Sequence, residues 1–322
     1  MKIAILGQIH EDGLNFLRSE NLEVKHVEDF NEDNLINKIS DVAGIVIRTA
    51  SLSANVLSNC KNLKIVSRHG VGYDNVDISY LNQNNIALAI TGKSNAVSVA
   101  EHVMTMMLTL SKNIFASDNL TRNNGFNRKA ELPDFSEIYQ KKILILGFGR
   151  IGQALAQRCL GFEMKVLVYD PFINPKTIIS KGCKITELKE GFEISDYISI
   201  HLPLSDKTKN LISFDEFKLF KKNLILINTA RGGIVNEEAL YNALIKKNIH
   251  AAGLDVFETE PPQQDNQLFS LDNILLTPHN SALTIECRKR MSIESCENTS
   301  FFLKNKDLLN FSNIINLKYL NS

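Results

Sequence analysis

Three strand-like segments in the second half of the chain end in side chains suited to acid–base chemistry and anion binding. "LILINTARGG" leads to Arg231, "AAGLDVFETEPP" to Asp255 and Glu260, and "ILLTPHNSA" to His279. A guanidinium can hold a carboxylate, an imidazole exchanges a proton near neutral pH, and a nearby carboxylate orients that ring and favours its charged form. Arg231, Glu260 and His279 together suit hydride chemistry on a 2-hydroxy acid. Spacing alone also allows a surface ion pair at Arg231, a turn acid at Glu260 and a loop cap at His279.

A glycine-rich segment in the middle of the chain could hold a dinucleotide. "KKILILGFGRIGQALAQRC" places Gly147, Gly149 and Gly152 in G-x-G-x-x-G spacing between an expected strand and an expected helix. Such glycines allow a tight turn and a close backbone approach to a pyrophosphate at the helix N-terminus. The next apolar run, "KVLVYD", ends in Asp170, where an acid can bind the ribose hydroxyls.

Asp170 also indicates which dinucleotide is bound. Its carboxylate would repel a 2′-phosphate, and the following residues, Pro171 and Phe172, offer no cation to hold one. We therefore expect NAD as the cofactor rather than NADP.

Two series of short apolar runs must position these residues. The first part of the chain contains "KIAIL", "GIVIR", "LKIVS" and "IALAIT", and the middle contains "KILILG", "KVLVYD", "YISIHL", "NLILINT", "AAGLDVF" and "NILLTPH". Continuous Val, Ile and Leu runs are typical of parallel strands covered on both faces, and their alternation with helical stretches indicates βαβ units. We therefore expect an α/β protein with two Rossmann-like, doubly wound parallel-sheet domains.

The order of these runs also predicts the domain boundaries. The last run ends near His279 with too few residues left for another domain. We expect an NAD-binding domain over residues 94–285, inserted into a substrate-binding domain made of residues 1–93 and 286–322.

A long apolar stretch, "SVAEHVMTMMLTLSKNIF" (98–115), predicts a helix that is apolar on most of its circumference. Such a helix must be buried on most of its surface. It is either a central helix of one domain or a helix that packs on its own domain and also on a second subunit.

Composition excludes several classes of protein. Lys plus Arg equals Asp plus Glu at 36 each, and no polybasic run occurs, so neither nucleic acid nor an anionic membrane is an expected partner. No stretch approaches the roughly 20 apolar residues of a membrane span, and the N-terminus resembles a strand rather than a signal peptide. The five cysteines are scattered without a C-x-x-C pair, which indicates neither a disulfide framework nor a metal site and favours a cytoplasmic location.

Seven segments resemble, in order, the D-isomer-specific 2-hydroxyacid dehydrogenases, most closely the phosphoglycerate dehydrogenase branch. The segments are "SRHGVGYDNVD" (67–77), "NAVSVAEH" (95–102), "GFGRIG", "HLPLSDKT" (201–208), "NTARGG" (228–233), "GLDVFETEPP" (253–262) and "TPHNSA" (277–282). Because 43 residues follow His279, we expect no C-terminal regulatory domain of the kind that some phosphoglycerate dehydrogenases carry.

The resemblance implies a role for each matching residue. It makes His279 the acid/base, Glu260 its carboxylate partner and Arg231 the substrate clamp. It places Asp255 near the nicotinamide carboxamide and Thr208 near the phosphates, and it implies a homodimer whose interface includes the 98–115 helix region. The remaining cofactor-binding residues would be Gly147, Gly149, Arg150, Ile151, Gly152, Asp170, Leu202, Pro203, Thr229 and Ala230. The substrate carboxylate would meet the backbone N–H groups of the "HGVG" loop. The expected substrate-binding residues are Arg48, Arg68, His69, Gly70, Val71, Gly72, Asn95 and Arg231, of which Arg48 and Arg68 are included for their place at expected strand ends rather than for the resemblance.

Two arginines at expected strand ends bear on the substrate. Arg48 closes "AGIVIR" and Arg68 follows "LKIVS", so both should lie at one edge of the first sheet. Two further guanidiniums suit a second anionic group, and 3-phosphoglycerate or its oxo form is the best single expectation. The alternative is a structural ion pair between Arg48 and Asp74 or Asp77.

Two other functions fit the same sequence. One is a glyoxylate or hydroxypyruvate reductase. The other, from a different class, is a nicotinamide-sensing binding protein of the co-repressor type, since a fold does not fix a function. Turnover of a 2-hydroxy or 2-oxo acid with NAD(H) separates an enzyme from a binding protein.

Overall fold

The computed structural model describes residues 1–304 and 312–320, and these form two compact units. Unit 1 comprises residues 1–95 and 283–322, and unit 2 comprises residues 96–282, inserted between the two segments of unit 1. These boundaries lie within three residues of those expected from the sequence.

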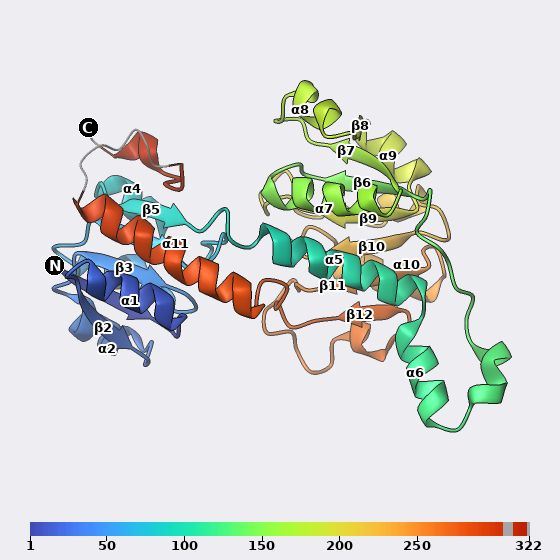
Figure 1. Ribbon diagram of the computed structural model, residues 1–322, viewed down its shortest axis with the longest axis horizontal. Coiled ribbons are helices and arrows are strands. Elements are labelled where there is room, and N and C mark those ends of the chain that lie inside the picture. Colours follow the sequence, from blue (N-terminus) through green and yellow to red (C-terminus); the bar gives the residue numbers. More distant parts are fainter. Residues whose placement is uncertain (305–311, 321–322) are drawn as a thin grey trace. The chain divides into compact units, whose positions relative to one another are not determined.

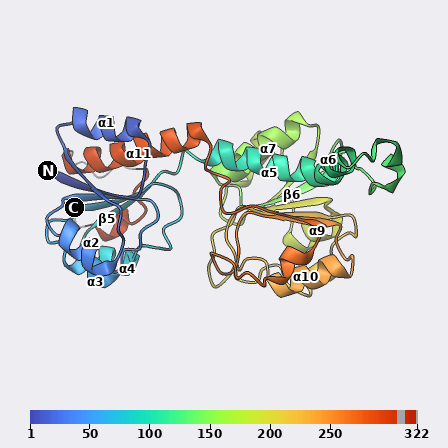
Figure 2. The same ribbon diagram turned by 90° about the horizontal axis from the view of Figure 1, so that it is seen from below.

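Unit 1 is built on a five-stranded parallel sheet with the order β2-β1-β3-β4-β5. Its strands are β1 (Lys2–Leu6), β2 (Glu23–Val27), β3 (Gly44–Ile47), β4 (Ile65–Arg68) and β5 (Ala87–Ile90). Its helices are α1 (Glu11–Ser19), α2 (Glu32–Ile39), α3 (Ala54–Ser58), α4 (Ile78–Gln83), α11 (Ile285–Lys304) and the short η5 (Leu317–Tyr319). Helices α1 and α11 cover one face and α2, α3 and α4 the other (Figure 2).

The two covered faces explain the continuous apolar run of β1. Ile3 and Ile5 belong to the cluster under α1, whereas Ala4 and Leu6 belong to the cluster under α2 and α3. All four side chains are fully buried, so alternate positions face two cores rather than one core and solvent.

Unit 2 is built on a seven-stranded parallel sheet with the order β12-β11-β10-β9-β6-β7-β8 (Figure 1). Its strands are β6 (Lys142–Leu146), β7 (Lys165–Tyr169), β8 (Lys184–Ile185), β9 (Tyr197–Ile200), β10 (Ile225–Asn228), β11 (Ala251–Leu254) and β12 (Ile274–Leu276). Its helices are α5 (Ala96–Ser111), α6 (Ile114–Arg122), α7 (Arg150–Gly161), α8 (Pro175–Ser180), α9 (Leu188–Ile194), α10 (Glu237–Ile245) and the short η1 (Phe126–Glu131), η2 (Glu216–Lys218) and η3 (Gln267–Ser270). The strand order reverses between β6 and β9, and ligands of such sheets bind at that switch point.

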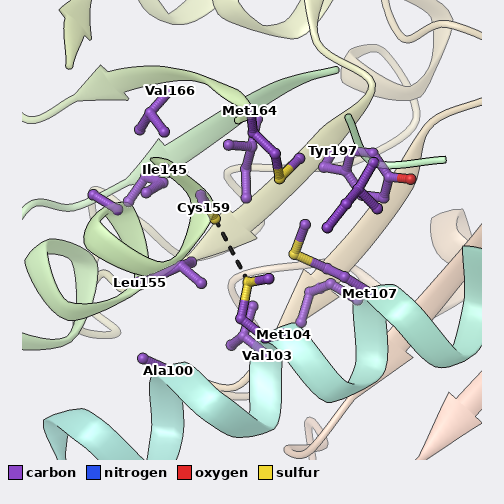
Figure 3. Close-up of a cluster of buried hydrophobic side chains, with 14 of the residues drawn as sticks. Ala100, Val103, Met104, Met107, Ile145, Leu155, Cys159, Met164, Val166 and Tyr197 are labelled. Carbon is purple, nitrogen blue, oxygen red and sulfur yellow. Dashed lines mark hydrogen bonds between the residues drawn. The ribbon is translucent and has the colours of Figure 1, made fainter. Parts of the chain in front are cut away.

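Helix α5 packs on α7 and on β10 and β11 and so lies within unit 2. Figure 3 shows Met104 and Met107 of α5 among Leu155 and Cys159 of α7, with the Cys159 Sγ 3.7 Å from the Met104 Sδ. These side chains are buried, which accounts for the apolar circumference noted in the sequence.

The prediction of one helix over residues 98–115 is wrong at the C-terminal end of that range. Helix α5 stops at Ser111, and a second helix, α6, begins at Ile114. Asn113 between them has a left-handed backbone with φ 44°, which no continuous α-helix contains. Phe115 therefore lies on α6, where it is 66% exposed.

Candidate functional site

His279 and Glu260 form a hydrogen-bonded ion pair at the carboxyl-terminal edge of the second sheet. Glu260 follows β11, and His279 follows β12, which pairs with β11 in parallel. The Glu260 Oε2 lies 2.7 Å from the His279 Nδ1, and the Glu260 Oε1 accepts a hydrogen bond of 3.1 Å from the Phe257 backbone N–H. The carboxylate therefore fixes the imidazole through one ring nitrogen and leaves Nε2 for another partner.

The two groups shift each other's protonation in the direction that favours the ion pair. The hydrogen bond from Glu260 raises the pKa of His279 above its usual value, against the opposing effect of burial. Burial alone would raise the pKa of Glu260, but the hydrogen bonds from His279 and Phe257 outweigh it and lower that pKa. The ion pair therefore favours the charged imidazolium over the neutral ring, relative to a histidine without such a partner.

Arg231 lies beside this pair. It follows β10, which pairs with β11, and its positive charge lowers the pKa of both His279 and Glu260. Its Nη1 donates 2.6 Å to the Ala230 carbonyl, and its own carbonyl accepts from the Asn228 side chain at 2.9 Å. The structure thus brings together the three residues that the sequence placed on separate strands.

Beside the pair lies a pocket of about 330 Å³ with mainly apolar walls. Phe257, Phe269 and Leu276 line it, and Glu260 and His279 stand at its edge. Apolar walls strengthen electrostatic interactions at a site by excluding water.

The glycine loop between β6 and α7 has the backbone that a dinucleotide requires. Gly147 has φ +92°, and a Cβ there would lie 2.7 Å from the His201 carbonyl oxygen. A Cβ at Gly152 would lie 2.2 Å from the Gly147 carbonyl oxygen, so this glycine permits close helix–strand packing. A Cβ at Gly149 would meet nothing within 4 Å, which leaves open space at the start of the helix.

Asp170 is joined directly to this loop. It follows β7, and its two carboxylate oxygens accept hydrogen bonds from the backbone N–H groups of Phe148, at 2.7 Å, and Phe172, at 2.9 Å. The Asp170 carboxylate therefore lies directly beside the glycine loop, where it could bind the hydroxyls of a ribose.

Other expected cofactor residues have the following geometry. Arg150 and Ile151 open α7, whose N-cap Gly149 supplies no side-chain cap. The Thr229 Oγ1 is buried without a hydrogen-bond partner, as a group awaiting a ligand would be. Thr208 closes a turn by donating to the Pro203 carbonyl at 2.6 Å. The fit of these residues to NAD rests on the open approach at Gly149, the unpartnered Thr229 hydroxyl and the position of Asp170.

Asp255 is fully buried, and its carboxylate holds the segment around His279. It accepts hydrogen bonds from the Thr277 hydroxyl and from the backbone N–H groups of Asn280 and Ser281, at 2.6, 2.9 and 3.0 Å. Nothing in the sequence pattern pointed to Thr277 or Ser281 as partners of this acid, although "GLDVF" and "TPHNSA" end neighbouring strands.

Burial lowers the pKa of two other histidines among or beside the expected site residues, His201 and His69. Burial lowers the pKa of His201 to about 3, and its Nε2 lies 2.9 Å from the Ser199 hydroxyl. Burial also lowers the pKa of His69 to about 4, with Arg48 and Arg68 acting in the same direction. Of His279, His201 and His69, only His279 has a pKa raised above the usual value.

Unit 1 gathers a second set of expected residues at the carboxyl ends of its strands. Ile47 and Arg68 are register partners of β3 and β4, so Arg48 and Arg68 lie on neighbouring strand ends, and both act electrostatically on His69. Arg68 donates to the Ile47 and His69 carbonyls, each at 3.2 Å. Arg48 donates to the Gln8 carbonyl at 3.0 Å.

The loop after β4 completes this set. Gly70 has φ +148°, and a Cβ there would lie 3.6 Å from the Arg68 Nη1, so the guanidinium runs under the loop. Asn95 is buried, and its Oδ1 has no hydrogen-bond partner. Val71 and Gly72 lie in the same loop.

Among residues 1–304 and 312–320, no group of His, Cys, Asp or Glu could hold a metal ion. Every helix there is too short or too polar to span a bilayer.

Comparisons with known proteins agree with this geometry. Residues 104–281 match the family model described as D-isomer specific 2-hydroxyacid dehydrogenase, NAD binding domain. The chain is 34% identical over 98% of its length to the D-3-phosphoglycerate dehydrogenase of Archaeoglobus fulgidus, and it spans only 59% of that relative. It is 37% identical over 87% of its length to the hydroxypyruvate reductase of Thermotoga maritima, of which it covers 91%.

A solved structure gives the same result. The D-lactate dehydrogenase of Aquifex aeolicus, crystallised with NAD and lactic acid, matches 94% of the chain with a TM-score of 0.81 and 28% identity. The expected α/β fold with two parallel-sheet domains is confirmed, and the NAD-binding model confirms the expected cofactor. Because one family model matches more than half of the chain, and relatives above 30% identity match most of it, this chain belongs to the D-isomer-specific 2-hydroxyacid dehydrogenase family.

Proposed function

We propose that this protein is an NAD-dependent dehydrogenase that interconverts a D-2-hydroxy acid and the matching 2-oxo acid. The observation that carries the proposal is the His279–Glu260 ion pair beside Arg231, located on the unit that holds the dinucleotide loop. Unit 2 is the NAD-binding domain in this proposal, and unit 1 is the substrate-binding domain. The test is an assay for turnover of 2-hydroxy and 2-oxo acids with NAD(H), and we expect at least one such acid to be turned over.

Each residue of the triad has a separate task. Arg231 holds the carboxylate of the acid by charge-assisted hydrogen bonds. A bound nicotinamide supplies or accepts the hydride. In reduction, protonated His279 gives its Nε2 proton to the carbonyl oxygen, and in oxidation neutral His279 removes the hydroxyl proton. Glu260 keeps the ring oriented and stabilises its charged form.

Glu260→Gln is expected to move the pH profile of reduction to lower pH. Reduction needs imidazolium, so its rate falls as pH rises through the pKa of His279. Glu260 raises that pKa, and its neutral replacement lowers it, so the fall occurs at a lower pH. The rise of oxidation with pH shifts in the same direction. The measurement is kcat/KM against pH in both directions.

Asp265→Asn is the matched control for this prediction. Asp265 is an exposed acid five residues beyond Glu260. Its replacement should leave both profiles in place. Equal profiles for wild type and Glu260→Gln would contradict the role given to Glu260.

Asp170→Asn is expected to narrow the preference for NAD over NADP. The change keeps an acceptor oxygen for only one of the Phe148 and Phe172 N–H groups, and it removes the charge that repels a 2′-phosphate. Two like charges about 4 Å apart repel by about 1 to 4 kcal/mol, so the preference should fall roughly tenfold or more. The ratio of kcat/KM for the two cofactors measures this. A wild-type enzyme that uses NAD and NADP equally well would contradict the assignment.

The substrate that best fits unit 1 carries a second anionic group. Arg48 and Arg68 lie on neighbouring strand ends beside His69, and the positive charges of both lower the pKa of that histidine. Two guanidiniums are more positive charge than glyoxylate or lactate requires, whereas they suit a phosphate, a sulfonate or a second carboxylate. 3-Phosphoglycerate is therefore the proposed substrate.

Arg68→Ala tests this proposal on a panel of 3-phosphoglycerate, hydroxypyruvate, glyoxylate, D-lactate and sulfolactate. Wild type should prefer a dianionic acid, and the variant should lose that preference while it keeps activity on small acids. Arg18→Ala, at an exposed ion pair with Glu11 in the same unit, is the control and should change neither. If lactate or glyoxylate is turned over at least as efficiently as every dianionic acid, the proposal that the substrate carries a second anionic group is wrong.

A hydroxypyruvate or glyoxylate reductase is the second candidate. The chain covers 91% of the Thermotoga maritima hydroxypyruvate reductase and 89% of the Pyrococcus furiosus glyoxylate reductase, at 37% and 35% identity. The same panel separates the two candidates, because a reductase of this kind should favour hydroxypyruvate or glyoxylate over 3-phosphoglycerate.

We also propose a homodimer that uses the 98–115 region. Ile114 and Phe115 at the start of α6 are 50% and 66% exposed, and Phe126 in η1 is 75% exposed. In Figure 1 this segment extends away from the sheet of unit 2. Sedimentation equilibrium should give twice the mass of one chain.

The five free cysteines are compatible with the cytoplasmic location that we propose.

A further inference from the structure

A hydrogen-bonded chain joins helix α5 to the segment that carries His279. The His102 Nε2, on α5, lies 3.1 Å from the Thr277 Oγ1, and that hydroxyl donates to the Asp255 Oδ1 at 2.6 Å. Asp255 is fully buried, and His102 is largely so, with 21% of its side chain exposed. All of these residues belong to unit 2.

Proton counting fixes the direction of each hydrogen bond. A threonine hydroxyl has one proton, and Thr277 gives it to the Asp255 carboxylate, which can only accept. His102 must therefore donate from Nε2 to the Thr277 oxygen. Burial lowers the pKa of His102 more than the Asp255 charge raises it, which favours the neutral ring, and the hydrogen bond then requires its proton on Nε2.

This chain of hydrogen bonds ends at Asp255, whose carboxylate binds the backbone segment on both sides of His279; we call these three contacts of Asp255 the clamp. Asp255 holds Thr277 through its hydroxyl, before the histidine, and Asn280 and Ser281 through their backbone N–H groups, after it. His279 itself has a left-handed backbone with φ 50°, a conformation that is strained for a residue other than glycine. Such a conformation persists only where neighbouring contacts hold it.

We propose that His102 is a positioning residue for His279, acting through Thr277 and Asp255. Glu260 fixes the His279 ring through Nδ1, whereas the His102–Thr277–Asp255 chain fixes the backbone from which that ring projects. His102 touches neither the ring nor a ligand in this role. The expected effect of His102 on kcat rests on the dehydrogenase function proposed above, whereas its effect on the backbone around His279 does not.

His102→Leu and His102→Gln form a matched pair that tests the donor. Leucine fills the space without a donor, and the glutamine amide can donate near the position of Nε2. His102→Leu is expected to lower kcat about tenfold, as the loss of one buried hydrogen bond allows, with NADH affinity unchanged. His102→Gln should recover most of kcat. A loss in Tm that is equal in both variants, with wild-type kcat in both, would overturn the proposal.

A double-mutant cycle tests the route through Thr277. Thr277→Val removes the hydroxyl at nearly constant volume. If His102 acts through that hydroxyl, His102→Leu causes no further decrease in kcat when Thr277 is already replaced by valine. Additive losses would overturn the proposed route.

Hydrogen exchange provides a readout that needs no turnover. In wild type the Asn280 and Ser281 amides donate to Asp255 and should exchange slowly. We expect them to exchange about tenfold faster in His102→Leu and Thr277→Val but not in His102→Gln. Unchanged protection in all three variants would overturn the clamp. A wild type that turns over no acid yet shows this exchange pattern would refute the proposed function alone.

Discussion

Replacing His279 with alanine is expected to lower kcat by about 10²–10⁴-fold while NADH binding persists. That range is typical of the loss of a positioned general acid or base. The dinucleotide loop and Asp170 lie on β6 and β7, on the other side of the strand-order reversal from β12, so their geometry does not depend on the imidazole. The measurements are steady-state kcat in both directions and NADH affinity by fluorescence titration.

The His250→Ala variant is the control for this prediction. His250 is exposed in the same unit, and only its backbone forms hydrogen bonds, with Leu224 and Asn273. Its kcat should equal that of wild type. A His279→Ala enzyme with near-normal kcat would contradict the assignment of His279, whatever the substrate.

The candidate triad could be predicted because parallel strands impose a direction. Arg231, Glu260 and His279 each follow an apolar run, and all carboxyl ends of one parallel sheet lie at one edge. The sequence did not reveal which strands are neighbours, but consecutive strands are adjacent here, in the order β10, β11, β12. The side chains of Glu260 and His279 lie 2.7 Å apart, as the predicted pairing of the two residues requires.

Two strands escaped prediction for the same physical reason. Strand β2, "EVKHV", lies at the edge of the first sheet, and only Val27 of its five residues is buried. Strand β8 has two exposed residues, Lys184 and Ile185, at the edge of the second sheet. Edge strands bury little surface, so the continuous apolar pattern that marks central strands is missing from them.

The break between α5 and α6 was hidden by the apolar pattern. Ile114 and Phe115 continue the hydrophobic spacing of α5, yet both are exposed on α6. Asparagine tolerates the left-handed conformation that Asn113 adopts, but an asparagine alone is a weak signal for it.

Side-chain networks were the least predictable part of the site. The bond between His102 and Thr277 joins residues 175 positions apart, and its existence depends on how α5 packs across β11 and β12. No residue spacing encodes that packing. The histidine therefore carried no functional signal in the sequence, although it lies within the "NAVSVAEH" segment.

Gly232→Ala is expected to destabilise the protein by about 3 kcal/mol or more and to remove most activity. A Cβ at Gly232 would lie 1.7 Å from the Phe257 carbonyl oxygen and 2.6 Å from the Glu258 backbone nitrogen. Both atoms belong to backbone, so the segments after β10 and β11 must separate to admit a methyl group. Overpacking of this kind costs about 1–3 kcal/mol where side chains can adjust, and more where they cannot.

The two segments that must separate carry Arg231 and Glu260, which explains why activity and stability should fall together. Urea unfolding measures the change in free energy, and kcat at a temperature where the variant is folded measures the change in the site. Gly161→Ala is the matched control, because a Cβ at Gly161, at the end of α7, would meet nothing within 4 Å. That variant should be as stable as wild type or slightly more stable, since alanine favours helix by up to about 1 kcal/mol over glycine. If Gly232→Ala unfolds at the same urea concentration as Gly161→Ala and retains wild-type kcat, the close approach of the two segments does not exist in the folded protein.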